Sequence, residues 1–117
     1  MQDFFTFSHF KKSPSLLHAV TTKLHDHPHT FSLALHTGDH AQNIVANRNR
    51  HSALLEHDRT LHFVVANQTQ SDNIKLITQK ETRGWESLSD AIEDCDALVT
   101  DLKGVVLNVL TADCVPV

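Results

Sequence analysis

The 117-residue sequence predicts an α+β fold with mixed β-sheets and flanking helices. Three observations carry this prediction. Short apolar segments rich in strand-forming residues recur along the chain, one longer segment has helical spacing, and the two kinds do not alternate regularly. At this length we expect a single domain over residues 1–117.

Two expected strands and the main helix occupy the first half of the chain. "LLHAVTT" at 16–22 has the composition of a short strand, and 29–37 alternates between apolar and polar residues. Asp39 with Gln42 three residues later resembles a capping box, which predicts a helix over about 41–56. Its apolar stripe is expected to contain Ile44, Ala46, Ala53, Leu54 and Leu55.

The second half of the chain is expected to be mostly strands. Residues 61–67 and 73–79 have strand composition, and a short helix is expected over 87–94. "DALVT" at 96–100 and "VVLNVLT" at 105–111 flank "DLKG", whose glycine can take a positive φ. This arrangement predicts a hairpin.

Charge and hydropathy exclude several classes of protein. The net charge is −4 and the pI is near 6.2, so there is no basic footprint for nucleic acid. No apolar stretch approaches the roughly 20 residues that cross a bilayer. The N-terminus lacks the pattern of a signal peptide, so a cytoplasmic location is expected. The oligomeric state is left open.

Ten histidines suggest metal binding at two places. His25, His27 and His29 alternate in "HDHPH", so they would share one face of a strand, whereas the proline favours a solvated loop. His36 and His40 could form half of a metal site. The alternative for that segment is a turn followed by a helix cap.

Two arginines lie on the expected helix. Arg48 and Arg50 are two residues apart and point to different faces. One of them can face inward and bind an anion, and the alternative is a solvated helix surface.

The two cysteines have different surroundings. Cys95 lies among carboxylates, which raise the pKa of a thiol and make it a poor nucleophile. Cys114 follows Asp113 at the end of an apolar strand, where it could be a nucleophile or a soft zinc ligand. The alternative for Cys114 is a buried structural thiol.

Several segments together resemble the YfiH-like family, also called laccase-domain or polyphenol oxidase proteins. "HAVTTK" is similar to H-G-V-S-T-R, and "SLALHTGDHAQNIVANR" resembles N-L-x-L-H-x-G-D followed by V-x-x-N-R. "NQTQSDNI" resembles Q-x-H-x-x-x-[VI]. The final 22 residues, 96–117, match D-A-L-V-T-x-x-x-G-x-x-L-x-V-x-T-A-D-C-x-P-V. Family members continue to H-A-G-W-R-G, so the resemblance implies that this chain is the N-terminal part of a longer domain.

The resemblance implies a zinc-dependent purine nucleoside phosphorylase and adenosine deaminase acting on purine nucleosides and phosphate. Zinc rather than copper is expected, held by the histidine of Q-x-H, the cysteine of T-A-D-C and the histidine of H-A-G-W. Three such ligands leave an open position for a reactive water. By the same resemblance, Cys114 is a metal ligand and catalytic residue, and Arg48, with His36 nearby, binds phosphate and substrate.

The sequence departs from the family at a metal ligand. Gln70 stands where the family has the first histidine, and an amide is a much poorer zinc ligand than imidazole. Weak or absent zinc and poor catalysis are therefore expected for this chain. Two alternatives remain: a non-catalytic member that binds a partner or ligand, and a cysteine hydrolase with Cys114 as the nucleophile.

Overall fold

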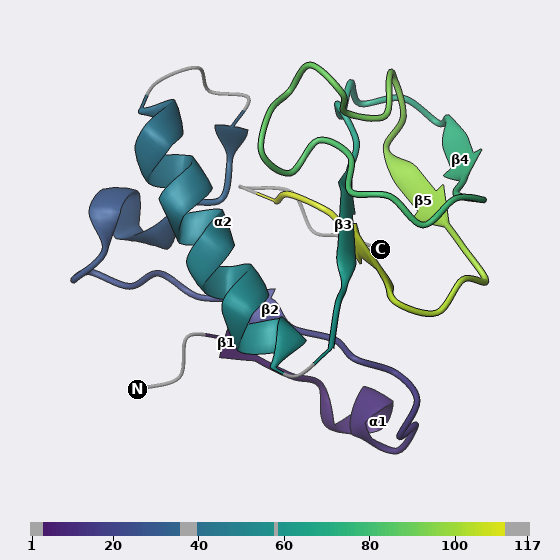
Figure 1. Cartoon of the computed structure of the whole chain (residues 1–117), viewed down its shortest axis with the longest axis horizontal. Coiled ribbons are helices and arrows are strands. Elements are labelled where there is room, and N and C mark those ends of the chain that lie inside the picture. Colours follow the sequence, from purple (N-terminus) through teal and green to yellow (C-terminus); the bar gives the residue numbers. More distant parts are fainter. Residues whose placement is uncertain (1–3, 36–39, 58, 112–117) are drawn as a thin grey trace.

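A computed structural model describes residues 4–35, 40–57 and 59–111 of the chain (Figure 1). Strands and helices are mixed along the chain, and the expected α+β class is confirmed. None of the helices in this described part is long and apolar enough to cross a membrane. The strands are β1 (Phe4–Phe5), β2 (Val20–Thr21), β3 (His62–Val65), β4 (Ile74–Leu76), β5 (Ala97–Val99) and β6 (Val105–Asn108), and the helices are α1 (Ser8–Lys11), the 3-10 helix η1 (Pro28–Phe31) and α2 (Ala41–Glu56).

The strands form three pairs of mixed direction. β1 and β2 are antiparallel. β3 and β6 are parallel, with His62 opposite Val105, and β4 and β5 are parallel, with Ile74 opposite Ala97. In Figure 1, β3 runs through the middle of the view, with α2 on one side and the β4–β5 pair on the other.

The predicted hairpin over 96–111 is wrong. β5 and β6 pair with β4 and β3 rather than with each other, and both pairings are parallel. The chain between them is held toward β4, because the Thr100 hydroxyl donates to the carbonyl of Ile77 at 2.8 Å. A turn sequence alone could not show that each strand has a more distant partner.

The short helix predicted over 87–94 is also absent, since this segment consists of bends and turns. Its backbone bonds to β3 instead: Ile92 donates to the carbonyl of Val65 at 3.2 Å, and Asn67 donates to that of Ile92 at 2.8 Å. Because these groups are satisfied by β3, no helical ladder forms.

The strand predicted over 29–37 is wrong for the residues that the structure describes. Residues 29–31 belong to η1, and 32–34 have no regular structure. The side-chain amide of Asn47 on α2 donates to the carbonyls of Pro28 and Ser32, at 2.9 and 3.0 Å. These bonds hold the segment against the helix in place of a strand partner.

The core lies on both sides of β3. Phe63 and Val65 pack with Leu55, Leu61 and Trp85 in one cluster. Val64 and Ala66 point the other way and pack with Ile77, Ile92 and Cys95 in a second cluster. Alternate residues of a strand face opposite sides, so β3 is a central strand buried on both faces.

Helix α2 has the predicted bounds but a different buried face. Its buried residues are Ile44, Asn47, Arg48, His51 and Leu55, so three polar side chains replace most of the predicted apolar stripe. The N-cap residue is His40, in the left-handed conformation and without a side-chain cap bond. The predicted cap residue, Asp39, lies outside the described residues.

Candidate functional site

The strands β3 and β6 end at the same edge of their pair because they are parallel, and this edge carries the candidate site. Gln68 follows β3 and Leu110 follows β6. The Gln68 side-chain amide donates to the Leu110 carbonyl at 3.1 Å, and its oxygen accepts the Leu110 N–H at 2.9 Å. The start of the loop that bears residue 70 is thus tied to Leu110, which precedes Thr111 and, further along the sequence, Cys114. The carboxyl ends of parallel strands are where α/β folds place ligands.

Gln70 lies on the loop between β3 and β4. Its side chain is exposed, and its φ of 60° is in the left-handed region. The Asp96 carboxylate accepts three consecutive backbone N–H groups of this loop: Thr69 at 3.1 Å, Gln70 at 3.0 Å and Ser71 at 2.9 Å. The Ser71 hydroxyl adds a fourth bond at 3.0 Å.

Asp94 supports the same loop from the other side of Cys95. Its carboxylate accepts the Thr69 hydroxyl at 2.5 Å, and its backbone carbonyl accepts the Asn73 amide at 2.9 Å. Hydrogen bonds from the loop backbone, first from Ser71, lower the pKa of Asp96 below its ordinary value. The carboxylate is therefore charged at neutral pH and holds the loop as an anion in a nest of N–H groups.

Arg48 lies inside the protein, so of the two alternatives left open for the helix arginines, the inward-facing one holds for Arg48. It is 1% exposed, whereas Arg50 is exposed. Its Nε donates to the Leu33 carbonyl at 2.8 Å, and its Nη1 donates to the carbonyls of Gly84 and Trp85, each at 2.7 Å. The guanidinium carbon lies 4.9 Å from the centre of the Trp85 ring, in a cation–π contact.

The remaining nitrogen of Arg48, Nη2, is buried without a hydrogen-bond partner. Burial lowers the pKa of Arg48 to about 10, so the group stays charged at neutral pH. Bidentate binding of phosphate by an arginine needs two free N–H groups on adjacent nitrogens. Nε and Nη1 are already used by carbonyls, so an anion could receive bonds from Nη2 alone.

The remaining predicted site residues are not brought together in the described structure. Cys114 and His36 lie outside the described residues, so their roles as metal ligand, nucleophile or substrate contact stay predictions. In the histidine-rich segment, His27 contacts Asp26 at 2.9 Å, and the rings of His29 and His40 stack at 4.2 Å. Over residues 4–35, 40–57 and 59–111, no three metal-ligating side chains gather in one place.

Cys95 is buried in the core cluster beside β3 and is 3% exposed. Burial, with smaller contributions from Asp96 and Asp94, raises the pKa of its thiol. The expectation that Cys95 is a poor nucleophile is consistent with this shift, although burial contributes more to it than the neighbouring charges do.

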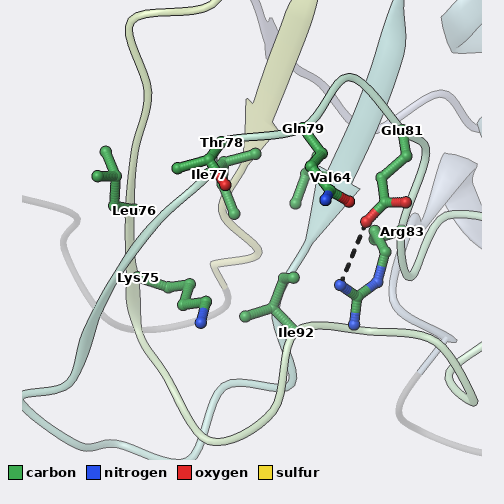
Figure 2. Close-up of a pocket in the computed structure, with 9 residues that line it drawn as sticks. All are labelled: Val64, Lys75, Leu76, Ile77, Thr78, Gln79, Glu81, Arg83 and Ile92. Carbon is green, nitrogen blue, oxygen red and sulfur yellow. Dashed lines mark ion pairs between the residues drawn. The ribbon is translucent and has the colours of Figure 1, made fainter.

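A groove of about 190 Å³ lies away from this edge, beside β4 (Figure 2). Val64 and Ile92 contribute apolar surface to it, and Lys75, Glu81 and Arg83 contribute charge. Arg83 pairs with Glu81 at 3.5 Å and donates to the carbonyl of Asp90 at 2.7 Å. The Arg83 guanidinium thus bonds within the protein, and none of the predicted site residues lines the groove.

This geometry defines a class of protein: a small α+β domain with a tethered loop at the carboxyl edge of a parallel strand pair. Residues 18–117 match the family described as multi-copper polyphenol oxidoreductase laccase. The chain belongs to this YfiH-like family and matches its N-terminal part.

Named relatives point to nucleoside chemistry. A purine nucleoside phosphorylase of Corynebacterium glutamicum is 37% identical over 90 residues, covering 75% of this chain and 33% of that protein. An adenosine deaminase of an unknown prokaryotic organism is 39% identical over 56 residues, covering 47% of this chain and 21% of that protein. The chain spans about a third of the length of the first of these relatives.

A solved structure shares the fold. The hypothetical protein YfiH of Bacillus licheniformis superimposes with a TM-score of 0.65 at 31% identity, covering 76% of this chain and 36% of that one. The family's description implies metal chemistry, and the donors in the described structure do not fit a zinc site. Position 70 offers a neutral amide rather than imidazole, and among the described residues no three metal-ligating side chains gather around it.

Sequence reasoning did not single out Gln68 or Asp96. Each lies inside a quoted family segment, but its partner is distant in sequence: Leu110 for Gln68 and the 69–71 backbone for Asp96. The sequence offered a polar loop at 67–73 and a separate carboxylate-rich segment at 93–96, compositions typical of side chains that bond to backbone, but nothing that joined the two.

Proposed function

We propose that this chain contributes to a purine nucleoside phosphorylase of the YfiH-like type, with adenosine deamination as a related activity. The named relatives support the substrate class. The observation that carries the proposal is the Gln68–Leu110 pairing, because it ties the loop bearing position 70 to the segment leading into Cys114. These are the two positions at which the family resemblance implies metal ligands.

The expected activity of the chain as it stands is low. An amide at position 70 is a weak zinc ligand, so zinc is held weakly or not at all. In phosphorolysis, a phosphate oxygen attacks the sugar C1′ as the bond to the purine breaks and positive charge develops on the sugar. Arg48 is the proposed phosphate contact; Nη2 is its one nitrogen without a partner, and because that nitrogen is buried, phosphate can reach it only if the surrounding side chains move. Cys114 and His36 remain the proposed metal and substrate contacts.

The test is turnover of inosine and of adenosine with phosphate and added zinc. It uses the longest form of the protein that its gene encodes and the Gln70→His variant of that form. Measurable phosphorolysis that rises in Gln70→His, together with a matching rise in bound zinc, supports the proposal. Gln79→His is a matched control, since it places the same imidazole at an exposed position outside this loop and leaves the Gln68–Leu110 pair intact.

The second candidate is a non-catalytic member of the family that binds a ligand. It is favoured by the exposed amide of Gln70, which can form hydrogen bonds but is a poor metal ligand. Absence of turnover and of bound zinc in both the parent protein and Gln70→His would replace the enzyme proposal with this one.

A further inference from the structure

The loop of residues 67–73 folds around a single carboxylate from another part of the chain. Three consecutive backbone N–H groups, from Thr69, Gln70 and Ser71, all point to Asp96 at 2.9–3.1 Å. One oxygen accepts from Thr69 and Ser71, and the other accepts from Gln70 alone. Converging N–H groups of this kind are the arrangement by which backbone binds an anion.

This arrangement explains an unfavourable conformation. Gln70 has a φ of 60°, a region in which a residue with a side chain is strained. Its side chain is exposed, so packing does not hold it there. The bond from its own N–H to Asp96 and those of its two neighbours are the contacts that hold the backbone at this position.

The loop is fixed at its two ends by other residues. Asn73 donates to the carbonyl and carboxylate of Asp94, at 2.9 and 3.3 Å, and Gln68 pairs with Leu110. In the middle of the loop, where position 70 lies, the Thr69 hydroxyl donates to Asp94, but the three backbone N–H groups all donate to Asp96. Loss of Asp96 would therefore leave the loop attached but its centre free to change direction.

We propose that Asp96 is a positioning residue of the candidate site: it fixes the backbone at residue 70 and with it the direction of the side chain at that position. The geometric part is independent of any activity. The functional part rests on the proposed function, in which position 70 is a ligand position. A ligand side chain must be held within about 0.5 Å of its productive position, and its supporting contacts commonly change metal affinity by about 10- to 100-fold.

The experiment measures loop order and metal affinity separately. Backbone amide exchange at residues 69–71 is followed by NMR in the parent chain, in Asp96→Asn and in Asp101→Asn. The last is the matched control, an exposed carboxylate on another loop that undergoes the same change of charge. Asp96→Asn replaces one acceptor oxygen with an N–H donor facing the loop, so exchange is expected to rise about 10-fold. Asp101→Asn should leave it unchanged.

Metal affinity is measured on the Gln70→His background by titration with Co²⁺, whose thiolate absorption band reports bonding to cysteine. Gln70→His/Asp96→Asn should bind Co²⁺ at least about 10-fold more weakly than Gln70→His. Gln70→His/Asp101→Asn should bind like Gln70→His. Faster exchange combined with lower affinity supports Asp96 as a positioning residue.

Failure of the two ideas can be told apart. If Gln70→His gains no Co²⁺ band, the metal part of the proposed function fails, and exchange alone decides the role of Asp96. Unchanged exchange in a folded Asp96→Asn overturns the inference, as does unchanged Co²⁺ affinity when Gln70→His binds. Should Asp96→Asn not fold, Ser71→Ala removes one of the four bonds, and no rise in exchange there would also overturn it.

Discussion

The side chain of Gln68 and the main chain of Leu110 form a two-bonded pair, with distances of 3.1 and 2.9 Å. The primary amide uses one of its two N–H donors and its carbonyl oxygen here, as a backbone peptide uses its donor and acceptor, so it continues the β3–β6 ladder beyond the last strand residues. The pair joins residues 42 apart in sequence. It links the loop after β3 to the residues that follow β6.

Gln68→Glu should break this pair while keeping its size. The carboxylate keeps an acceptor for the Leu110 N–H but faces the Leu110 carbonyl with an oxygen instead of a donor. We expect a loss of about 1 kcal/mol in the free energy of unfolding, measured by urea denaturation. Gln79→Glu, an exposed position with the same chemical change, should stay within about 0.5 kcal/mol of the parent. Equal effects of the two changes would rule out a specific role for the pair.

Arg48→Lys should be strongly destabilising even though it conserves charge. The three carbonyls of Leu33, Gly84 and Trp85 are placed for a planar guanidinium, and a lysine ammonium cannot reach them with the same geometry. Carbonyls left buried without donors cost about 1–3 kcal/mol each, so a loss of about 3 kcal/mol or more in the free energy of unfolding is expected.

The control for Arg48 is Arg50→Lys on the exposed side of the same helix, which should change stability by less than about 0.5 kcal/mol. The comparison also separates two roles of Arg48. A folded Arg48→Lys protein with parent-like stability and a raised KM for phosphate would show that binding, rather than holding the 84–85 backbone, is its main task.

Helix α2 shows what sequence patterns can and cannot predict. Its bounds follow from local spacing, and the expected 41–56 agrees with Ala41–Glu56. Its buried face could not be predicted from hydropathy, because Asn47 and Arg48 are buried by bonds to irregular backbone at 28–33 and 84–85. Polar side chains become interior when carbonyls without strand or helix partners need donors.

The candidate site also has one part that could be predicted from the sequence and one part that could not. The family resemblance, which the match over 18–117 confirms, is what singled out position 70, and the role of that position stays a prediction. The supports of that position were not predicted, since Gln68–Leu110 and Asp96 with the 69–71 backbone depend on parallel pairing of distant strands. The predicted hairpin placed those strands beside each other instead. An error in pairing therefore hid the contacts that build the site.

Gly84 and Gly104, which both have positive φ among the described residues, make a matched test of close packing. A methyl group on Gly84 would lie 2.5 Å from the Val65 carbonyl oxygen and 2.9 Å from the Cβ of Ala91, with φ at 71°. On Gly104, where φ is 80°, the nearest atom is the Thr60 carbonyl oxygen at 3.8 Å. Gly104→Ala should cost only the conformational term of about 1 kcal/mol.

Gly84→Ala should cost about 3 kcal/mol or more, because the clash is with the backbone of the central strand and adds to the same conformational term. Thermal or urea unfolding of both variants measures the difference. Similar losses of unfolding free energy in the two variants would mean that the backbone near β3 can shift to accommodate the methyl group. The close contact at Gly84 would then not be a rigid constraint.

Cys95 should be nearly unreactive in the folded chain. Burial raises the pKa of its thiol above the ordinary 9.0, so less of the reactive thiolate is present near neutral pH. The residue is also only 3% exposed, which limits the access of a reagent. The folded state favours the protonated thiol, so this group's contribution to stability is present below pH 9.0 and is lost as the pH rises through the raised value.

Alkylation by iodoacetamide at about pH 8, followed by mass spectrometry of the Cys95 peptide, should be fast in urea and slow in buffer. Asp94→Asn should change the rate in buffer only slightly, because burial is the larger cause of the shift. A rate in buffer equal to that in urea would show that the second core cluster opens readily around this residue.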